Sequence, residues 1–230
     1  MNQFSRSILL FGEKNYNKIS TSKIAVVGIG GVGSYAVEAL ARTGVGSLII
    51  IDYDKVEATN INRQIWALSS TVGKYKVDVA RERLLDINPG LEIVANNKRL
   101  TADSVNGLIP ADVDFVIDAI DSIIDKVSLI EYCLKRKIPV ISCMGAARRK
   151  DPTKIKTGNI NESISGPLIK RFRKELRKRN VALDFPIVYS EEKAIDVQKG
   201  EPLPSCCFTT GTVGFAAAAY VCEFISNAKV

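Results

Sequence analysis

Residues 24–63 read IAVVGIGGVGSYAVEALARTGVGSLIIIDYDKVEATNINR. The β-branched run at 24–27 predicts a buried strand, residues 35–42 have helical character, and the apolar run at 48–51 predicts a second strand that ends in Asp52. The turn between the first strand and the helix carries four glycines, Gly28, Gly30, Gly31 and Gly33. This order of strand, glycine turn, helix, strand and acid is typical of a nucleotide-binding βαβ unit.

The glycine turn predicts how a nucleotide binds. Because glycine has no Cβ, backbone N–H groups can approach phosphates closely, and the N-terminus of the following helix favours negative charge. Asp52, at the end of the second strand, is placed to accept hydrogen bonds from ribose hydroxyls. A glycine motif alone is a weak signal, but the surrounding strands and helix are present, so we expect a nucleotide site.

Length and composition predict a soluble globular protein. The chain has 230 residues, of which 46% are hydrophobic and 25% charged. We expect a single domain over 1–230, with a nucleotide-binding core at 24–145 and a tail at 146–230. The formal net charge of +7 favours an anionic partner such as a nucleotide or nucleic acid, although simple solubility also explains it.

The chain has five cysteines and no histidine. The odd number of cysteines and a start without a signal-peptide pattern predict free thiols and a cytoplasmic location. The lack of histidine excludes Ser-His and Cys-His nucleophiles and an imidazole base, and the lack of a CxxC pair argues against a structural zinc site. Cys206 and Cys207 either carry an acyl or sulfur group or are small apolar residues at the entrance of a helix; we favour the second alternative.

Residues 208–225 form the most apolar segment and approach the length of a membrane span. Three threonines, two glycines and Glu223 interrupt this segment. We therefore expect a buried C-terminal helix at about 213–226 and no membrane association.

Strands and helices alternate through the core. Further strands are predicted at 91–95, 113–117 and 139–143, with helices at 76–88, 101–108 and 123–135. Right-handed crossovers then predict an α/β, Rossmann-like fold with a mainly parallel sheet and helices on both faces. Outside the core we expect helices at 4–20, with a break at Gly12, and at 167–180, strands at 153–159 and 187–189, and a mobile loop at 191–204.

The segment after Asp52 carries polar groups that suit a phosphate. Arg63 can offer paired N–H donors to phosphate oxygens, and Asn60 and Asn62 can hold ribose or phosphate. A dehydrogenase has no need of such a run. The alternative is a simple turn with a solvated arginine.

Three more residues are expected at the same crevice. Lys76 opens a predicted helix, where a lysine opposes the helix dipole, so it is either solvated or faces an anion. Asp118 and Asp121 follow a buried strand and are expected to share the crevice with the glycine turn. Asp121 either holds Mg²⁺ that bridges to phosphate or caps the next helix, and both can hold together.

A basic helix in the tail predicts contact with RNA. Residues 169–179 crowd seven cations around Phe172, namely Lys170, Arg171, Arg173, Lys174, Arg177, Lys178 and Arg179. Such a face supplies salt-dependent binding to phosphates. The alternative is a solvated surface helix.

Four motifs, GIGGVG, IIDYDKVEATNINRQ, GKYKVDVARERLLDINP and VIDAIDS, occur in this order. In them the chain resembles the ubiquitin-activating-enzyme superfamily in its bacterial (ThiF/MoeB-type) adenylyltransferase form, over nearly all of residues 4–145. FSRSILLFGEK, ISCMGAARRKDPTKIK and the basic helix are similar to the branch of tRNA-modifying dehydratases. The resemblance implies an adenylation domain that uses ATP and Mg²⁺.

The resemblance also implies roles for individual residues. Gly31 would touch the α- or β-phosphate, Asp52 the ribose, and Asp121 the Mg²⁺. Arg6 matches an arginine that reaches the ATP of the neighbouring subunit, which implies a homodimer. Catalysis would rest on Arg6, Arg63, Lys76 and Asp121, and the ATP site would comprise Gly28, Gly30, Gly31, Gly33, Asp52, Asp54, Asn60, Asn62, Arg63, Gln64, Lys76, Asp121 and Ser122.

The activity implied is adenylation of the threonyl carboxylate of threonylcarbamoyladenosine in tRNA, followed by cyclisation onto a nearby nitrogen with release of AMP. The first alternative is activation of the C-terminus of a sulfur-carrier or ubiquitin-like protein, against which the missing zinc motif and the basic helix count. The second alternative is an NAD-dependent oxidoreductase, in which Arg63, Lys76 and Asp121 would have no role. An inactive nucleotide-binding RNA adaptor and a sulfur-transfer protein partner also stay open.

Overall fold

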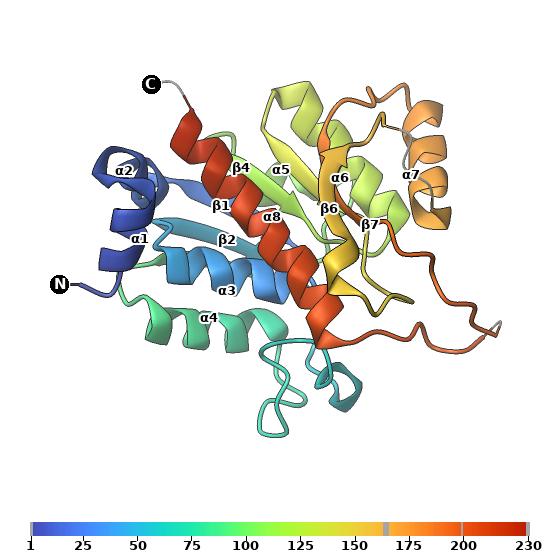
Figure 1. The fold of residues 1–230 in the computed structure, drawn as a ribbon, viewed down its shortest axis with the longest axis horizontal. Helices are drawn as coiled ribbons and strands as arrows, with labels where there is room; N and C mark the ends of the chain where they lie inside the picture. The colour runs from blue at the N-terminus through green and yellow to red at the C-terminus, as the bar shows by residue number, and fades with distance from the viewer. Residues whose placement is uncertain (1, 163–165, 199, 229–230) are drawn as a thin grey trace.

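The computed structural model describes residues 2–162, 166–198 and 200–228. Its centre is a seven-stranded sheet in the order β3-β2-β1-β4-β5-β7-β6 (Figure 1). All neighbouring strands are parallel except β6, which runs antiparallel to β7. The strands are β1 Lys23–Val27, β2 Ser47–Ile51, β3 Glu92–Asn96, β4 Phe115–Asp118, β5 Val140–Cys143, β6 Ile155–Asn159 and β7 Pro186–Ser190.

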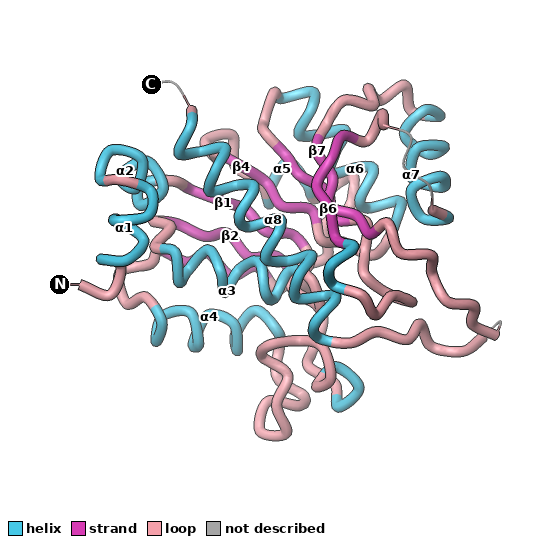
Figure 2. Tube along the Cα trace, viewed as in Figure 1, coloured by secondary structure: helices cyan, strands magenta, loops and turns pink. Residues whose placement is uncertain are grey.

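Helices cover both faces of this sheet (Figure 2). One face packs against α3, α4 and α8, and the other against α5, α6 and α7. The predicted Rossmann-like α/β fold is therefore confirmed. The helices are α1 Ser5–Phe11, α2 Glu13–Thr21, α3 Gly33–Thr43, α4 Lys76–Ile87, α5 Val105–Leu108, α6 Ile123–Arg136, α7 Pro167–Lys178 and α8 Cys207–Asn227, with short 3-10 turns η1 Ala58–Asn60 and η2 Pro152–Lys154.

The central strand β1 separates two apolar cores. Ile24 and Val26 face α3 and α8, whereas Ala25 and Val27 face the helices on the other side, because successive side chains of a strand point to opposite faces. All four side chains are almost fully buried. A strand buried on both faces gives the continuous apolar run that marks 24–27 in the sequence.

The C-terminal helix α8 lies diagonally across the sheet beside α3 (Figure 1). It begins at Cys207, six residues before the predicted start at 213. By length and composition, α8 is also the one helix in the described part of the chain that could cross a membrane. Because 56% of its apolar window is buried inside the protein, α8 is a core helix here, as the sequence predicted.

Two further predicted elements differ from the structure. The helix expected at 101–108 is limited to α5, because the side chains of Thr101 and Ser104 bond to each other's backbone N–H groups in a turn. The strand expected at 113–117 is displaced towards the C-terminus: β4 starts at Phe115 and includes Asp118, which pairs with β1 and β5. Asp118 therefore lies inside the sheet rather than in the loop beyond it.

Gly214 makes the close approach of α8 to α3 possible, and replacing it tests that contact. A Cβ at Gly214 would collide with the carbonyl oxygen of Val32 and lie 2.9 Å from the amide nitrogen of Ala36. We expect Gly214→Ala to lower the free energy of unfolding by about 1–3 kcal/mol, measured by urea denaturation. Gly107→Ala is the matched control, since a Cβ at that helical position meets no atom within 4 Å. Equal stability of the two variants would contradict this packing.

Candidate functional site

A cavity of about 1070 Å³ lies at the carboxyl ends of the parallel strands. Its walls come from the loops that follow β1 to β5, together with residues 202–205 just before α8. In open α/β sheets this edge is where ligands bind. The volume lies at the upper end of the roughly 300–1,000 Å³ of a small-molecule site, so a nucleotide and part of a second substrate can share it.

The glycine turn forms one wall of the cavity as predicted from the sequence. Gly28 has φ of +81°, and a Cβ there would lie 2.8 Å from the carbonyl oxygen of Ala119. Gly33 packs so tightly against the carbonyl of Gly28 that no side chain fits. Gly30 and Gly31 line the cavity, and they leave room that a ligand can use.

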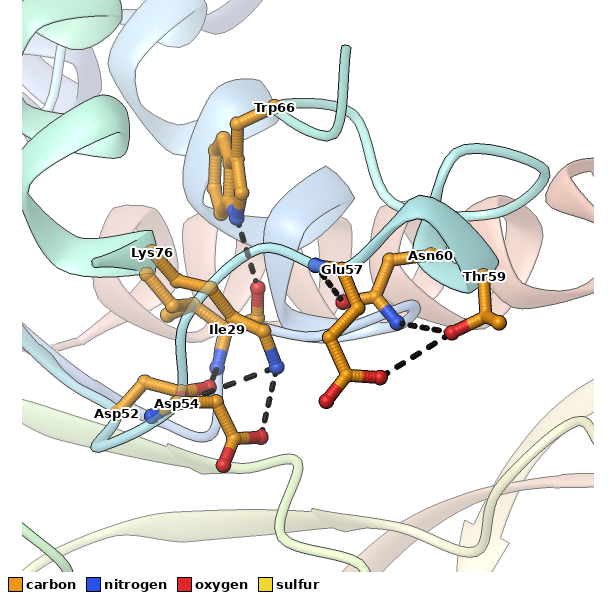
Figure 3. A network of polar contacts seen from close by, with 8 residues as sticks. All are labelled: Ile29, Asp52, Asp54, Glu57, Thr59, Asn60, Trp66 and Lys76. Carbon is orange, nitrogen blue, oxygen red and sulfur yellow. Dashed lines mark hydrogen bonds and ion pairs between the residues drawn. The ribbon is translucent and has the colours of Figure 1, made fainter. Parts of the chain in front are cut away.

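Asp52 is buried beneath the glycine turn, and it holds the turn in place (Figure 3). Its Oδ2 accepts the N–H of Ile29 at 2.8 Å, and its Oδ1 accepts the N–H of Asp54 at 2.9 Å. Burial raises the pKa of the Asp52 carboxyl above its ordinary value, against the opposing effects of Lys76 and these hydrogen bonds. Asp52 lines the cavity, but both of its oxygens already have backbone partners, a structural task that the sequence did not reveal.

Lys76 is the first residue of α4 and is almost completely buried. Its ammonium group lies 2.8 Å from Asp54 Oδ2 and 3.9 Å from Asp52 Oδ1 (Figure 3). Lys76 is therefore not solvated, and the anions that it faces in this structure are carboxylates of its own chain. Because Asp54 is half-exposed, it can give way to a phosphate oxygen at the same ammonium group.

The segment after Asp52 folds into η1 and a series of turns. The side chain of Asn60 accepts the N–H of Glu57 at 3.3 Å, and the indole of Trp66 donates to the carbonyl of Ile29 at 3.0 Å (Figure 3). These bonds fix the segment beside the glycine turn. The guanidinium of Arg63 donates to the carbonyl of Thr59 at 2.7 Å, lines the cavity and packs its stem near Gly31.

Gln64 is buried at the bottom of this wall, next to Gly30. Its Oε1 is the one buried side-chain oxygen or nitrogen in the described residues that has no hydrogen-bond partner. Since buried polar atoms nearly always have a partner, this acceptor fits a ligand that supplies a donor.

The loop after β4 separates the two aspartates that the sequence placed together. Asp118 is fully buried outside the cavity, so the expectation that it faces the crevice is wrong. Asp121 is exposed and lines the cavity, and the N-cap position of α6 belongs to Ser122. Capping of α6 by Asp121 is therefore not observed. Ser122 also lines the cavity, without a side-chain capping bond.

Several cavity residues were missed by sequence reasoning. Lys98, Arg99 and Leu100 follow β3, and Arg99 forms an ion pair of 2.7 Å with Asp125 of α6. Their position after the carboxyl end of a strand was the signal that could have identified them. Arg6, in contrast, is exposed on α1 and does not line the cavity of its own chain.

We call the described part of residues 191–206 the strap, which reaches the cavity through 202–205. Arg148 anchors the strap with two hydrogen bonds. Its backbone N–H donates to the carbonyl of Pro204 at 2.7 Å, and its side-chain Nε donates to the backbone carbonyl of Ile195 at 2.6 Å. Asn62 donates to the carbonyl of Ser205 at 2.9 Å. Asn62 thus links the nucleotide wall to the strap.

The cysteines differ in access. Burial raises the pKa of the thiols of Cys133 and Cys143 to about 12 and that of Cys222 to about 11, so these thiols stay protonated at neutral pH. Cys206 is the N-cap residue of α8, and Cys207 is exposed at its start.

The basic helix α7 begins at the cavity. Leu168, in its first turn, lines the cavity, and Ile169, Phe172 and Leu176 form the buried face of the helix. Arg173 donates to the backbone carbonyls of Ile160 and Glu162, so it holds the turn after β6. The exposed cations of α7 are Lys170, Arg171, Lys174, Arg177 and Lys178.

Comparison with known proteins agrees with this geometry. Residues 4–229 match the ThiF family. The tRNA threonylcarbamoyladenosine dehydratase of Bacillus subtilis is 42% identical over 199 residues, which cover 86% of this chain and 78% of that protein. The enzyme of the same name from Escherichia coli is 39% identical over 208 residues, or 90% and 73% of the two chains.

The structural comparison gives the same result. The crystal structure of the E. coli tRNA N6-threonylcarbamoyladenosine dehydratase in complex with ATP matches with a TM-score of 0.91 at 37% identity, covering 97% of this chain and 93% of that one. The resemblance inferred from the four sequence motifs is confirmed. The chain belongs to the ThiF family and, within it, to the tRNA threonylcarbamoyladenosine dehydratases.

Proposed function

We propose that this protein is an ATP-dependent enzyme that adenylates the threonyl carboxylate of threonylcarbamoyladenosine in tRNA and drives its cyclisation. One observation carries the proposal: a single cavity joins the glycine turn, Arg63, Lys76 and Asp121 to the first turn of the basic helix α7. The E. coli relative crystallised with ATP supports the choice of nucleotide.

The chemistry explains why the cavity needs positive charge. A carboxylate is a poor acyl donor because its leaving group would be oxide. Attack of its oxygen on the α-phosphorus of ATP breaks the bond to the bridging oxygen, so that pyrophosphate leaves with the electron pair and an acyl-adenylate forms. A nitrogen of the same modification then attacks the acyl carbon, loses its proton and displaces AMP. The net change in the nucleoside is the loss of one water.

The residues of the cavity fit this sequence of steps. Negative charge builds on the phosphates, and the guanidinium of Arg63 and the ammonium group of Lys76 are fixed by hydrogen bonds where they can stabilise it. The attacking carboxylate is already ionised, so the first step needs no general base. This agrees with a chain that contains no histidine.

Magnesium fits as an ion held mainly by phosphates. No cluster of three metal-ligating side chains occurs in the described residues. Asp121 is an exposed cavity carboxylate with no hydrogen bond or ion pair to the described part of the chain. Mg²⁺ commonly takes one or two carboxylates together with substrate phosphates and water. When bound at Asp121, it would neutralise charge on the triphosphate.

The basic helix supports an RNA substrate. At about 1.5 Å of rise per residue, α7 carries its cations from the cavity edge at Leu168 to Arg177 over ~14 Å. Such a track can hold the phosphates that flank a nucleoside inserted into the cavity. A carrier-protein tail, the alternative substrate, makes no use of these cations.

Exposed apolar side chains support a homodimer. Leu9 and Leu10, which are 84% and 80% exposed on α1, lie close in sequence to Arg6, and Phe208 and Phe215 are half-exposed on α8. The two adjacent exposed leucines offer an apolar contact for a second copy beside Arg6. In the proposed dimer, Arg6 of each protomer completes the ATP site of the other. A sulfur-transfer protein partner stays an untested alternative.

The activity is tested with ATP, Mg²⁺ and tRNA that carries threonylcarbamoyladenosine, followed by digestion and mass spectrometry of the nucleosides. We expect loss of one water by the modified adenosine; an unchanged nucleoside would refute the proposal.

Arg63→Ala and Asp121→Ala should each lower the rate of AMP formation by about 10²–10³-fold, with little change in melting temperature. Arg81→Ala, at an exposed position on α4 outside the cavity, is the control. Full activity of either site variant would contradict the assigned site.

The RNA-binding role of α7 is tested by charge reversal. Lys174→Glu combined with Arg177→Glu should weaken tRNA binding. The fall of log K with log salt should become less steep, by about 1–2 in the magnitude of the slope. Arg173 is left intact because it holds backbone carbonyls. The control reverses two exposed cations away from α7, Lys14 and Arg81. An unchanged salt dependence in the α7 variant would reject this face.

The sharing of Arg6 between protomers is tested by mixing two inactive variants. Arg6→Ala and Asp121→Ala proteins are unfolded and refolded together, so that mixed dimers form. If Arg6 acts across a two-fold interface, one site of each mixed dimer is intact, and about a quarter of the parent activity returns for random pairing. No recovery would show that Arg6 acts within its own chain, and full activity of the Arg6→Ala protein alone would show that Arg6 has no catalytic role.

A further inference from the structure

A buried ion pair lies beneath the cavity, at the ends of β4 and β5. Lys126 of α6 is 1% exposed, and its ammonium group lies 2.8 Å from Asp118 Oδ2, 3.0 Å from the carbonyl of Cys143 and 3.3 Å from Ser142 Oγ. Ser142 also donates to Asp118 Oδ2 at 2.5 Å, and the N–H of Ile120 donates to Asp118 Oδ1 at 3.1 Å. The three N–H donors of the ammonium group are thus matched by three acceptors.

Fold stability alone does not explain this network. Its surroundings are apolar, with Val116, Val127 and Phe172 all fully buried nearby in the same core cluster. Replacing a buried ion pair by apolar residues of similar size is often neutral or stabilising, because removing two charges from water costs several kcal/mol per ion. The network is therefore expected to fix a geometry that apolar side chains would leave loose.

The network holds the starts of two cavity loops. Asp118 bonds to the N–H of Ile120, in the loop 119–122 that carries Asp121 to the cavity. Lys126 bonds to the carbonyl of Cys143, where the loop with Gly145, Ala146 and Ala147 leaves β5 and continues along the cavity. One ammonium group therefore sets the spacing between these two walls.

The same lysine also contacts the basic helix. Its ammonium group lies 5.8 Å from the centre of the Phe172 ring on the buried face of α7. Lys126 itself does not line the cavity, so it has no direct contact with a bound substrate. It can act on the reaction only through the elements that it holds.

We propose that Lys126, together with Asp118 and Ser142, is a positioning residue that fixes the Asp121 loop relative to the 143–147 loop, so that the α-phosphate of ATP meets the substrate carboxylate in line. This inference rests on the proposed dehydratase activity. Misplacement of reacting groups by ~1 Å can cost about 10²-fold in rate. Binding of ATP depends mainly on the glycine turn and Lys76 and should change little.

The test replaces the pair by apolar residues of similar size, Lys126→Met with Asp118→Leu. We expect kcat for dehydration to fall by about 100-fold, while the melting temperature is equal or higher and the Kd for ATP changes by less than about threefold. Hydrogen exchange should accelerate about tenfold at 119–122 and 143–147 only. Three results would each overturn the proposal: a kcat within threefold of the parent value, a loss of ATP affinity as large as the loss of kcat, or faster hydrogen exchange throughout the sheet.

A milder pair of variants keeps the test decisive if the double variant fails to fold. Ser142→Ala retains the ion pair but removes the hydroxyl that bonds to both Lys126 and Asp118, and kcat should fall several-fold with faster exchange in the two loops. Ser128→Ala is the matched control, since Ser128 is a buried serine of α6 whose hydroxyl contacts Ile124 and Arg179 instead. Identical behaviour of the two serine variants would refute the proposal. A parent protein that removes no water would refute the proposed function, and the exchange data would still decide the role of the network.

Discussion

The buried carboxylate of Asp52 is the constraint on which the nucleotide site depends. It accepts N–H groups from Ile29 in the glycine turn and from Asp54 in the next loop, so one side chain holds two walls of the cavity together. Burial opposes its charge, and Lys76 at 3.9 Å offsets part of that cost. The wall that we propose for the phosphates of ATP is therefore held in place by hydrogen bonds of the protein itself.

Much of the fold could be predicted because local and global signals agree. The apolar runs at 24–27 and 48–51 are buried on both faces of a parallel sheet, which leaves them without polar interruption. The errors arise where side chains compete with the backbone. Thr101 and Ser104 bond to backbone groups and shorten α5. Asp118 is charged, so the sequence pattern does not indicate that it belongs to a strand. The residues at the start of α8 show no helical hydrophobic period, so the sequence does not mark where this helix begins to pack against α3.

The candidate site was predictable where a motif marks it and not where tertiary contacts create it. The glycine turn, Lys76 and Asp121 do meet at one cavity. The strap reaches the same cavity from a distant part of the chain, and no local pattern indicates that. Arg99 also reaches it, and only its position after the carboxyl end of a strand could have identified it. The sequence also does not show which polar side chains have a structural role. Asn62 is bonded to the strap, and Arg173 supports a turn, although in the sequence it is one cation among several.

Two lysine–aspartate pairs, at the carboxyl ends of β2 and β4, show how access to the cavity separates roles. Lys76 lies at the cavity wall, and its closest partner, Asp54, is half-exposed, so a phosphate can take over that contact. Lys126 lies outside the cavity, and all three of its N–H donors are matched by buried acceptors, so it can exchange none of them. The same ionic chemistry therefore provides an adjustable contact at the end of β2 and a fixed one at the end of β4. A reaction that brings two anions together needs both, since charge must be neutralised at the phosphates while the surrounding loops keep their spacing.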